Sequence, residues 1–219
     1  MHVQLETIET ADKRAFQLMV NPRLSDLFFW HFHPEYELVY IEAESGTRHV
    51  GSHVSQYQSG DLVLIGSNIP HLNFDYGIKT PYRQVVVHLS TGFVEQGIQH
   101  IPELGHIHRL LQQATYGLAF RGDTIHQIGQ QLFDLEEMAP VRRFTAFVDT
   151  LDQLAHLPET VHLHEQPYDQ LYSARDQGRI RRIHAFIDAE YHRKIDLQEM
   201  ADLCHMSKEG FCRYFKKVT

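Results

Sequence analysis

The feature that most limits the fold of this chain is a change of hydrophobic period near residue 103. Before it, short apolar segments recur about every ten residues, and pairs such as Asn21-Pro22 and Ser59-Gly60 separate them as turn-forming residues do. After it, apolar residues recur every three or four positions, as on one face of an α-helix. The sequence therefore predicts an α+β protein with a β-rich N-terminal region and a helical C-terminal region.

Several apolar segments before residue 90 predict strands, at Phe16–Val20, Glu37–Ile41, Asp61–Ile65 and Arg83–Leu89. The run Val85-Val86-Val87 is typical of a strand that is buried on both faces. No helical pattern lies between these segments, so we expect an all-β sandwich or barrel over residues 1–100.

The segment His31-Phe-His33-Pro-Glu35-Tyr-Glu37 concentrates ionisable side chains. In a continuous strand its two histidines and two glutamates share one face, because side chains alternate. Such a face is costly to bury unless it lines a cavity or meets water. Imidazoles two residues apart can chelate a divalent ion with a carboxylate completing the set. His71, which follows the predicted strand Asp61–Ile65, offers a further imidazole.

Together with Gly60-Asp61 and Pro70-His71, this segment resembles the two sequence blocks of the cupin family, a small double-stranded β-helix barrel. The chain departs from the family in the second block, where Gly66-Ser-Asn-Ile-Pro70-His71 lacks the usual Pro-x-Gly. A divalent metal site (zinc, iron, manganese or nickel), a metal-free ligand pocket and a solvated strand face therefore remain as alternatives. The resemblance implies that the metal-binding or ligand-binding residues are His31, His33, Glu37 and His71.

Two amphipathic helices are predicted within residues 101–158. The apolar stripe of the first contains Ile125, Ile128, Leu132 and Leu135, and that of the second contains Phe144, Phe147, Val148, Leu151 and Leu154. We expect the second stripe to form a seam between two copies of the chain, so that residues 101–158 are a helical dimerisation segment. Packing of both helices on the barrel is the alternative.

Residues 159–176 are polar and contain Pro167, which is typical of a linker. The charge balance changes after this linker. From Arg179 to Thr219 there are nine Lys/Arg and six Asp/Glu, a net charge of +3, whereas the remaining residues hold 11 basic and 22 acidic side chains, a net charge of −11. This asymmetry indicates that only the C-terminal region contacts a polyanion.

Residues 177–219 predict a short helical domain with two helices joined by a tight turn at His205-Met206. Leu197, Phe211 and Phe215 are predicted to form its core. The arrangement is that of a helix-turn-helix, whose second helix enters the major groove of DNA. The predicted DNA-binding residues are Ser207, Lys208, Glu209, Arg213, Lys216 and Lys217.

This unit resembles the first helix-turn-helix of the AraC-type (AraC/XylS) transcription regulators at Leu197, Ala201, Ser207, Phe211, Arg213, Phe215 and Lys216. Many members carry an N-terminal cupin-like sensor domain, so the two resemblances span nearly the whole chain. The family places a second helix-turn-helix further along the chain. We therefore expect that this sequence is truncated after the first half of the DNA-binding domain, residues 177–219.

The combined resemblance implies a ligand-responsive, sequence-specific transcription regulator that is not an enzyme. Its barrel would bind a small-molecule effector such as a sugar, and its full-length form would bind promoter DNA as a homodimer. The alternative is a metal-dependent cupin enzyme, an isomerase or dioxygenase, with an accessory helical domain. Two cysteines close to the C-terminus make no disulfide framework, and no apolar stretch suits a signal peptide or a membrane span. We therefore expect a cytoplasmic protein without membrane contact.

Overall fold

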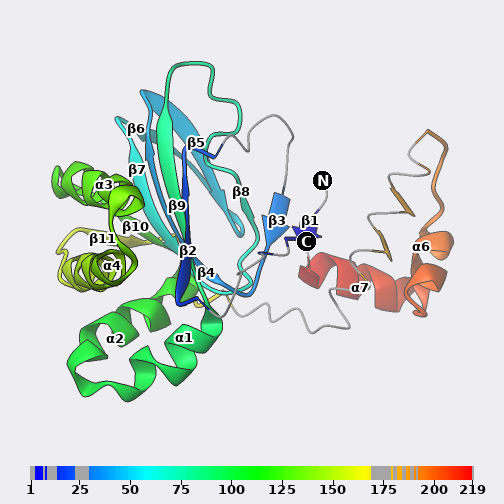
Figure 1. Ribbon diagram of the computed structural model, residues 1–219. Coiled ribbons are helices and arrows are strands. Elements are labelled where there is room, and N and C mark those ends of the chain that lie inside the picture. The colour runs from blue at the N-terminus through cyan, green and yellow to red at the C-terminus, as the bar shows by residue number, and fades with distance from the viewer. Residues whose placement is uncertain are drawn as a thin grey trace.

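The structure is a computed structural model that describes residues 3–6, 8, 14–22, 30–168, 179, 182–183, 186–187, 190 and 192–218. These residues form two β-sheets, helices that cover one of the sheets, and a group of helices near the C-terminus (Figure 1). The predicted α+β class is confirmed.

The described strands pair antiparallel with their neighbours, apart from the parallel pair β1 and β3. The five-stranded sheet has the order β1 (Val3–Leu5), β3 (Trp30–Phe32), β8 (His71–Leu72), β5 (Ser45–Val50), β6 (His53–Gln58). The six-stranded sheet has the order β11 (Thr160–His162), β10 (Leu118–Phe120), β7 (Asp61–Ile65), β4 (Tyr36–Glu42), β9 (Arg83–Leu89), β2 (Phe16–Val20). The predicted ranges of β2, β7 and β9 are confirmed, and β4 extends its predicted range by one residue at each end.

The two sheets pack face to face, and we call them the β-sandwich. Alternation along β4 shows how: Val39 and Ile41 join a buried cluster with residues of both sheets, whereas Leu38 and Tyr40 join a cluster on the helical side. Glu37 has the same parity as Val39, so the pleat directs its carboxylate between the sheets. The pleat of β4 therefore explains why Glu37, a charged residue, lies in the interior.

Strand β9 is buried on both faces, as its run of valines predicts. Val85 and Val87 belong to the cluster on the helical side, and Val86 belongs to the cluster between the sheets. His88 follows with the parity of Val86 and is also buried.

The predicted strand from His31 to Glu37 is not continuous, and this prediction was wrong. β3 ends at Phe32, the chain turns at His33, Pro34 and Glu35, and β4 starts at Tyr36 in the other sheet. Proline lacks a backbone N–H and fits poorly into a central strand, which explains the break at Pro34.

Helices cover the outer face of the six-stranded sheet and one end of the β-sandwich (Figure 1). They are α1 (Thr91–Gln96), α2 (Gly105–Gln113), α3 (Thr124–Asp134) and α4 (Pro140–Ala155), with 3-10 turns η2 (Ile98–His100), η3 (Pro102–Leu104), η4 (Ala114–Tyr116) and η5 (Leu135–Glu137). The two predicted amphipathic helices correspond to α3 and α4, and α2 was not predicted. None of the described helices is long and apolar enough to cross a membrane.

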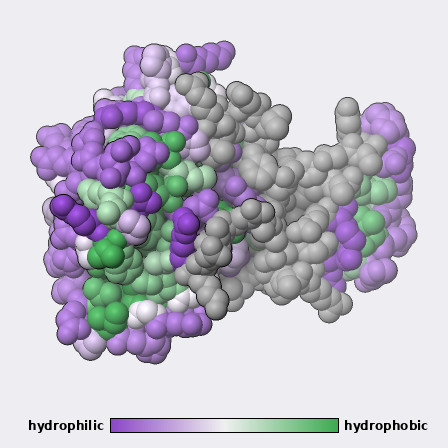
Figure 2. All heavy atoms as spheres, in the orientation of Figure 1, coloured by the Kyte–Doolittle hydropathy of each residue, from purple (hydrophilic) through white to green (hydrophobic). Residues whose placement is uncertain are grey.

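The prediction that the whole stripe of α4 forms a dimer seam was wrong for three of its residues. Phe147, Leu151 and Leu154 are fully buried in this chain's own core, against the six-stranded sheet and its helices. A six-stranded sheet needs an apolar layer on its outer face, and α4 supplies it. Phe144, at 39% exposure, and Val141, at 77%, stay accessible. Figure 2 also shows apolar surface at the end of the molecule where α1 and α2 lie.

Strand β11 lies within the predicted linker 159–176. It pairs with β10 through the register Ala119↔Val161. The polar, proline-containing sequence around β11 is typical of a linker, and yet three of its residues extend the sheet edge.

Near the C-terminus, α6 (Leu197–Leu203) and α7 (Lys208–Val218) are joined by four residues. Asp196 and Glu199 form a capping box at the start of α6. α6 ends in a Schellman motif, because Met206 N–H donates to the Ala201 carbonyl (2.9 Å) while His205 takes a left-handed φ of 54°. This sharp stop produces the predicted tight turn.

The helices near the C-terminus have a core of their own, formed by Ile183, Met200, Ala201, Cys204 and Phe211. The prediction that Leu197 belongs to this core was wrong, since Leu197 is 42% exposed as the first residue of α6. Phe215 packs against the core and is half-buried. The predicted helix over about 177–191 lies largely outside the described residues, although the described residues within it are helical.

Candidate functional site

Four side chains predicted as ligands lie together inside the β-sandwich. His31 is in β3, His33 follows it, Glu37 is in β4, and His71 is in β8 opposite His31. One ligand atom from each lies within 4.8 Å of the corresponding atoms of the others, and all four residues are buried. Glu35, which was expected to share their face, lies in the turn instead, with its carboxylate 3.7 Å from His33 Nδ1.

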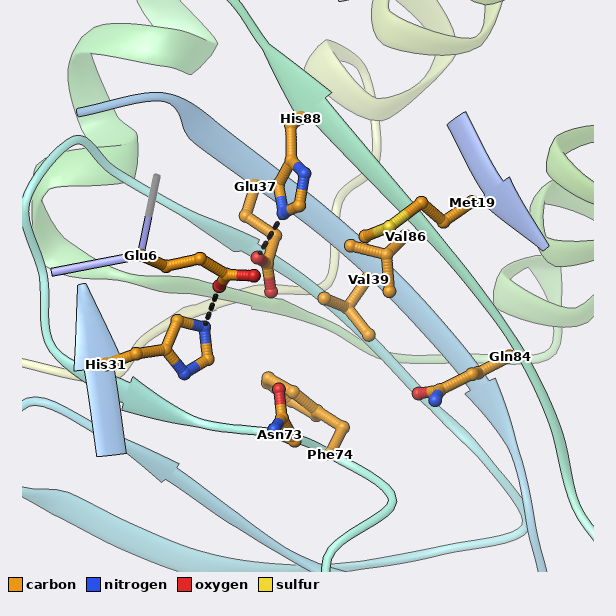
Figure 3. A pocket seen from close by; sticks show the side chains of 10 residues that line it. All are labelled: Glu6, Met19, His31, Glu37, Val39, Asn73, Phe74, Gln84, Val86 and His88. Atoms are coloured by element: carbon orange, nitrogen blue, oxygen red, sulfur yellow. Dashed lines mark hydrogen bonds and ion pairs between the residues drawn. The ribbon is translucent and has the colours of Figure 1, made fainter. Parts of the chain in front are cut away.

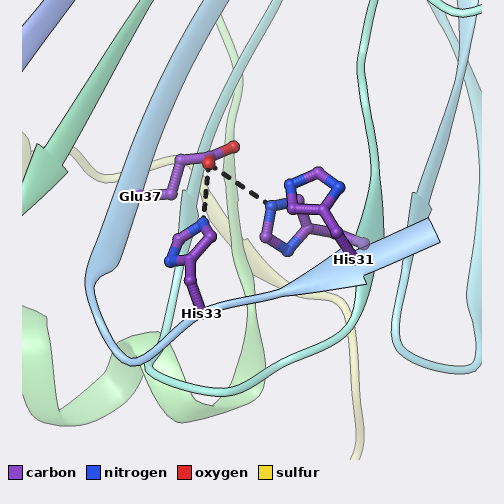
Figure 4. Close-up of side chains that lie close together, drawn as sticks. His31, His33 and Glu37 are labelled. Atoms are coloured by element: carbon purple, nitrogen blue, oxygen red, sulfur yellow. Dashed lines mark hydrogen bonds and ion pairs between the residues drawn. The ribbon is translucent and has the colours of Figure 1, made fainter. Parts of the chain in front are cut away.

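Glu37 is the centre of this group, which we call the acid-imidazole cluster. Its Oε2 atom lies 3.0 Å from His33 Nε2 (Figure 4). The same oxygen lies 3.3 Å from His71 Nε2. His88 Nε2 approaches the same oxygen at 2.8 Å. Three imidazoles from different strands and loops therefore converge on one carboxylate oxygen.

The tautomers of two imidazoles follow from their outer contacts. His33 Nδ1 lies 3.1 Å from the Glu35 carbonyl, and His71 Nδ1 lies 2.8 Å from the Ile69 carbonyl. A carbonyl oxygen only accepts hydrogen bonds, so each Nδ1 must carry a proton. In a neutral ring the Nε2 atom is then unprotonated and carries a lone pair. Both lone pairs face Glu37, which also only accepts. Such an arrangement is stable when the rings take a second proton or when a cation lies between the groups.

Backbone carbonyls on the outer nitrogen are also the usual second partners of metal-ligating histidines, because they fix the tautomer and the ring orientation. The three imidazoles and one carboxylate of His31, His33, His71 and Glu37 form a donor set that suits divalent transition metals. The residues present therefore fit a metal ion.

Electrostatics favours the ionised form of Glu37. Burial by itself raises the pKa of this carboxyl, but with protonated rings the charge of His71 and the hydrogen bonds from His33, His71 and His88 outweigh it. They hold the pKa of Glu37 well below its ordinary value. The cluster thus contains a fixed negative charge in the protein interior.

Sequence reasoning missed two members of the site. His88 reaches Glu37 because the register of β4 and β9 places these residues opposite each other. Glu6 follows β1 and places its Oε2 atom 3.2 Å from His31 Nε2. The parity of His88 with Val86 in an otherwise apolar strand was an available signal, whereas the pairing of β1 with β3 was not visible in the sequence.

A small pocket adjoins the cluster (Figure 3). Its lining residues are Glu6, Met19, His31, Glu37, Val39, Asn73, Phe74, Gln84, Val86 and His88. The free volume is about 10 Å³. That is about what one water molecule needs, so this pocket among the described residues has room for a water or an ion.

The predicted DNA-binding residues lie at the start and along one side of α7. Lys208, Glu209 and Arg213 are exposed. Ser207 is exposed as well, and its hydroxyl oxygen caps α7 by accepting a hydrogen bond from Gly210 N–H (3.1 Å). Lys216 and Lys217 belong to α7, but their side chains lie outside the described residues. The side chains of Lys208 and Asp196 approach to 3.8 Å across the start of the two helices.

No protein-family model and no curated protein match the sequence. Among solved structures, ToxT from Vibrio cholerae aligns with 93% of this chain and 76% of its own, at 12% identity and a TM-score of 0.43. A structure of ToxT with a bound unsaturated fatty acid aligns with 94% of this chain and 74% of its own, at 12% identity and a TM-score of 0.37. These values are too low to show a family.

Proposed function

We propose that this chain contains the sensor and a DNA-binding helix-turn-helix of an AraC-type transcription regulator, and that its β-sandwich is a cupin-like, metal-binding sensor. In this proposal residues 1–100 sense, residues 101–158 support dimerisation, and residues 177–219 contact promoter DNA. The protein would work in the cytoplasm without membrane contact and without enzymatic activity.

The observation that carries the DNA-binding part is the geometry of α6 and α7. A capping box, a Schellman stop, a four-residue turn and a shared core around Phe211 produce two short helices in a fixed arrangement. The first turn of α7 is exposed and carries Lys208 and Glu209, and Arg213 follows one turn later. In a helix-turn-helix these are the positions that face base edges and phosphates.

The acid-imidazole cluster supports a divalent metal ion in the sensor. The ion would be held by His31, His33, Glu37 and His71, which come from β3, the turn after it, β4 and β8. A bound ion would supply positive charge that links the two sheets. In two of the three imidazoles, those of His33 and His71, a backbone carbonyl already holds the outer nitrogen.

The small pocket among the described residues has room for about one water molecule, which favours an ion over a sugar at that position. A metal-dependent cupin isomerase or dioxygenase would hold its ion with the same four residues. The exposed basic start of α7 therefore favours the regulator, since an enzyme has no need of such a unit.

The apolar surface of α4 that is free to meet a second copy is smaller than the predicted stripe. Val141 and Phe144 are exposed on α4, and the Phe144 ring contacts that of Phe93 with centroids 5.6 Å apart. A second copy that packs on this patch would bury two large apolar side chains. Sedimentation of the wild type and of Phe144→Asp tests this: the variant should shift to monomer at concentrations where the wild type is dimeric.

A titration with fluorescently labelled DNA tests the main proposal. The duplex would cover the region upstream of the protein's own gene, at low salt, since one recognition helix makes few contacts and each phosphate contact weakens with salt. Arg213→Ala should reduce the affinity by about tenfold, in line with 1–3 kcal/mol for a base or phosphate contact. Arg142→Ala, which removes the same charge from an exposed position of α4, should leave the affinity within about twofold.

Two outcomes would contradict the proposal. Equal losses for Arg213→Ala and Arg142→Ala would show that α7 has no special role and that binding is only a matter of net charge. No binding by the wild type at low salt, with or without added zinc, iron, manganese or nickel, would remove the DNA-binding function itself.

A further inference from the structure

The N-terminal segment brings a second carboxylate to the acid-imidazole cluster. Glu6 N–H donates to the Phe32 carbonyl (3.0 Å), which continues the parallel pairing of β1 with β3 by one residue. This hydrogen bond places the Glu6 side chain over His31, with its Oε2 atom 3.2 Å from His31 Nε2. Glu6 and Glu37 line the same small pocket (Figure 3).

The two carboxylates differ in their role within the cluster. Glu37 is buried and contacts three imidazoles. The Glu6 side chain is 32% exposed and contacts His31 from the side of the N-terminal strand. A carboxylate placed against an imidazole that belongs to a candidate metal site can either pair with a protonated ring or bind the same ion as the ring. The summed charge of the ion and its ligands decides whether Glu6 pairs with a protonated His31 or binds the same ion as His31.

The charge balance favours shared binding of an ion. A divalent ion with three neutral imidazoles and Glu37 alone leaves one excess positive charge in the interior, and an uncompensated buried charge is costly. The Glu35 carboxylate lies on the outer, Nδ1 side of the His33 ring (3.7 Å), so Glu6 is the carboxylate that can supply a second negative charge at the ion itself and bring the ion and its ligands to zero. The pocket between Glu6 and Glu37 has room for about one water-sized group, which suits an ion and its immediate ligands.

We propose that Glu6 is a fifth ligand of the metal site, and that the divalent ion held there acts as an effector of this protein. This inference rests on the metal-binding sensor proposed above and adds a ligand from β1 to it. Five protein ligands favour metals that accept five or six donors, such as iron, manganese or nickel, over a four-coordinate structural zinc site.

Cobalt(II) absorption provides the test, because the visible bands of this ion report its ligands and coordination number. Metal-free wild type, Glu6→Gln and the control Glu44→Gln would each be titrated with Co²⁺. Glu44→Gln removes an exposed carboxylate between β4 and β5 that does not belong to the cluster, and it should keep the wild-type spectrum and an affinity within about twofold. Glu6→Gln should weaken Co²⁺ binding by about tenfold or more and change the position and intensity of the bands.

Hydrogen exchange adds a readout that does not depend on affinity. Co²⁺ should slow exchange of the Glu6 amide in the wild type, since the ion would hold the segment that donates to Phe32. In Glu6→Gln, at Co²⁺ concentrations that saturate the variant, that slowing should be lost while the amides of β4 stay protected.

The outcomes separate the two proposals. Identical Co²⁺ affinity, spectrum and Glu6 exchange in the wild type and Glu6→Gln would overturn the role of Glu6 but leave the four-residue site standing. A wild type that takes up no Co²⁺ would overturn both. Normal Co²⁺ spectra without any effect of the ion on DNA affinity would keep Glu6 as a ligand and remove the effector assignment.

Discussion

The β-sandwich and the α6–α7 unit use charged residues in opposite ways. In the β-sandwich, Glu37 lies in the interior among imidazoles, and Arg48 pairs with Asp61 at 2.7 Å with both side chains buried. In the α6–α7 unit, Lys208 Nζ lies 3.8 Å from Asp196 Oδ1, and both side chains are exposed to solvent. Buried charges have few alternatives to their partners, whereas exposed charges can exchange a partner for water or for a phosphate.

This difference assigns the two regions different tasks. A buried cluster responds to an ion that enters it, because the ion changes the balance of charge in a medium that screens poorly. An exposed basic surface can give up weak intramolecular pairs and bind a polyanion at little cost. The predictions below test whether the same kinds of charge behave differently in the two regions.

The largest expected effect on stability is at the buried pair Arg48–Asp61. Arg48→Met should lower the free energy of unfolding by about 3–5 kcal/mol, since it leaves the Asp61 carboxylate buried without its partner. Urea denaturation at pH 7 measures this. A loss below about 1 kcal/mol would show that the pair behaves like a surface pair and would break the comparison.

A smaller, pH-dependent effect is expected at Asp61 itself. Burial raises the pKa of this carboxyl to about 6, although Arg48 works in the opposite direction. The folded chain therefore binds the proton more tightly than the unfolded chain, and the contribution of Asp61 to stability falls as the pH rises from about 4 to about 6.

Asp61→Asn should remove this dependence. The difference in unfolding free energy between the variant and the wild type should then change across pH 4–6 in favour of the variant, and stay constant above pH 7. A difference that does not vary with pH would contradict a raised pKa of Asp61.

The smallest effects belong to the α6–α7 unit. Asp196→Ala should cost about 1 kcal/mol through loss of the N-cap of α6, because the side chain of Asp196 accepts from Gln198 N–H. Lys208→Ala removes the ion-pair partner alone and should cost less than about 0.5 kcal/mol. Thermal unfolding of the α6–α7 unit measures the loss of stability in each variant. Equal losses of unfolding free energy in the two variants would mean that the ion pair, and not the cap, stabilises the start of α6.

The sequence was most informative where a structure depends on neighbours in the chain. Strands β2, β7 and β9, the helices α3 and α4 and the turn at His205-Met206 were predicted, because local period and turn residues determine them. The C-terminal core around Phe211 was predicted for the same reason. Leu197 was misplaced, since a helical stripe does not show at which residue the buried face begins.

The candidate site was predicted in part, because it is made from both local and distant residues. His31, His33, Glu37 and His71 were found from spacing and family resemblance, although the strand that was thought to align them is broken at Pro34. Glu6 and His88 depend on the pairing of β1 with β3 and of β4 with β9, and such registers are not written in local sequence. The dimer stripe failed because a helix that covers its own sheet has the same pattern as one that meets a partner.

Metal content of the protein as purified tests the central claim most directly. The protein would be expressed without a histidine tag, isolated without chelators and analysed by mass spectrometry of its elements, beside the double variant His33→Ala/His71→Ala. The account predicts about one divalent transition metal ion per wild-type chain, on the basis of one four-residue donor set, and a near-complete loss in the variant, which should keep its circular dichroism spectrum. Equal metal content in both proteins, or no metal in the wild type even after incubation with zinc, iron, manganese and nickel, would contradict it.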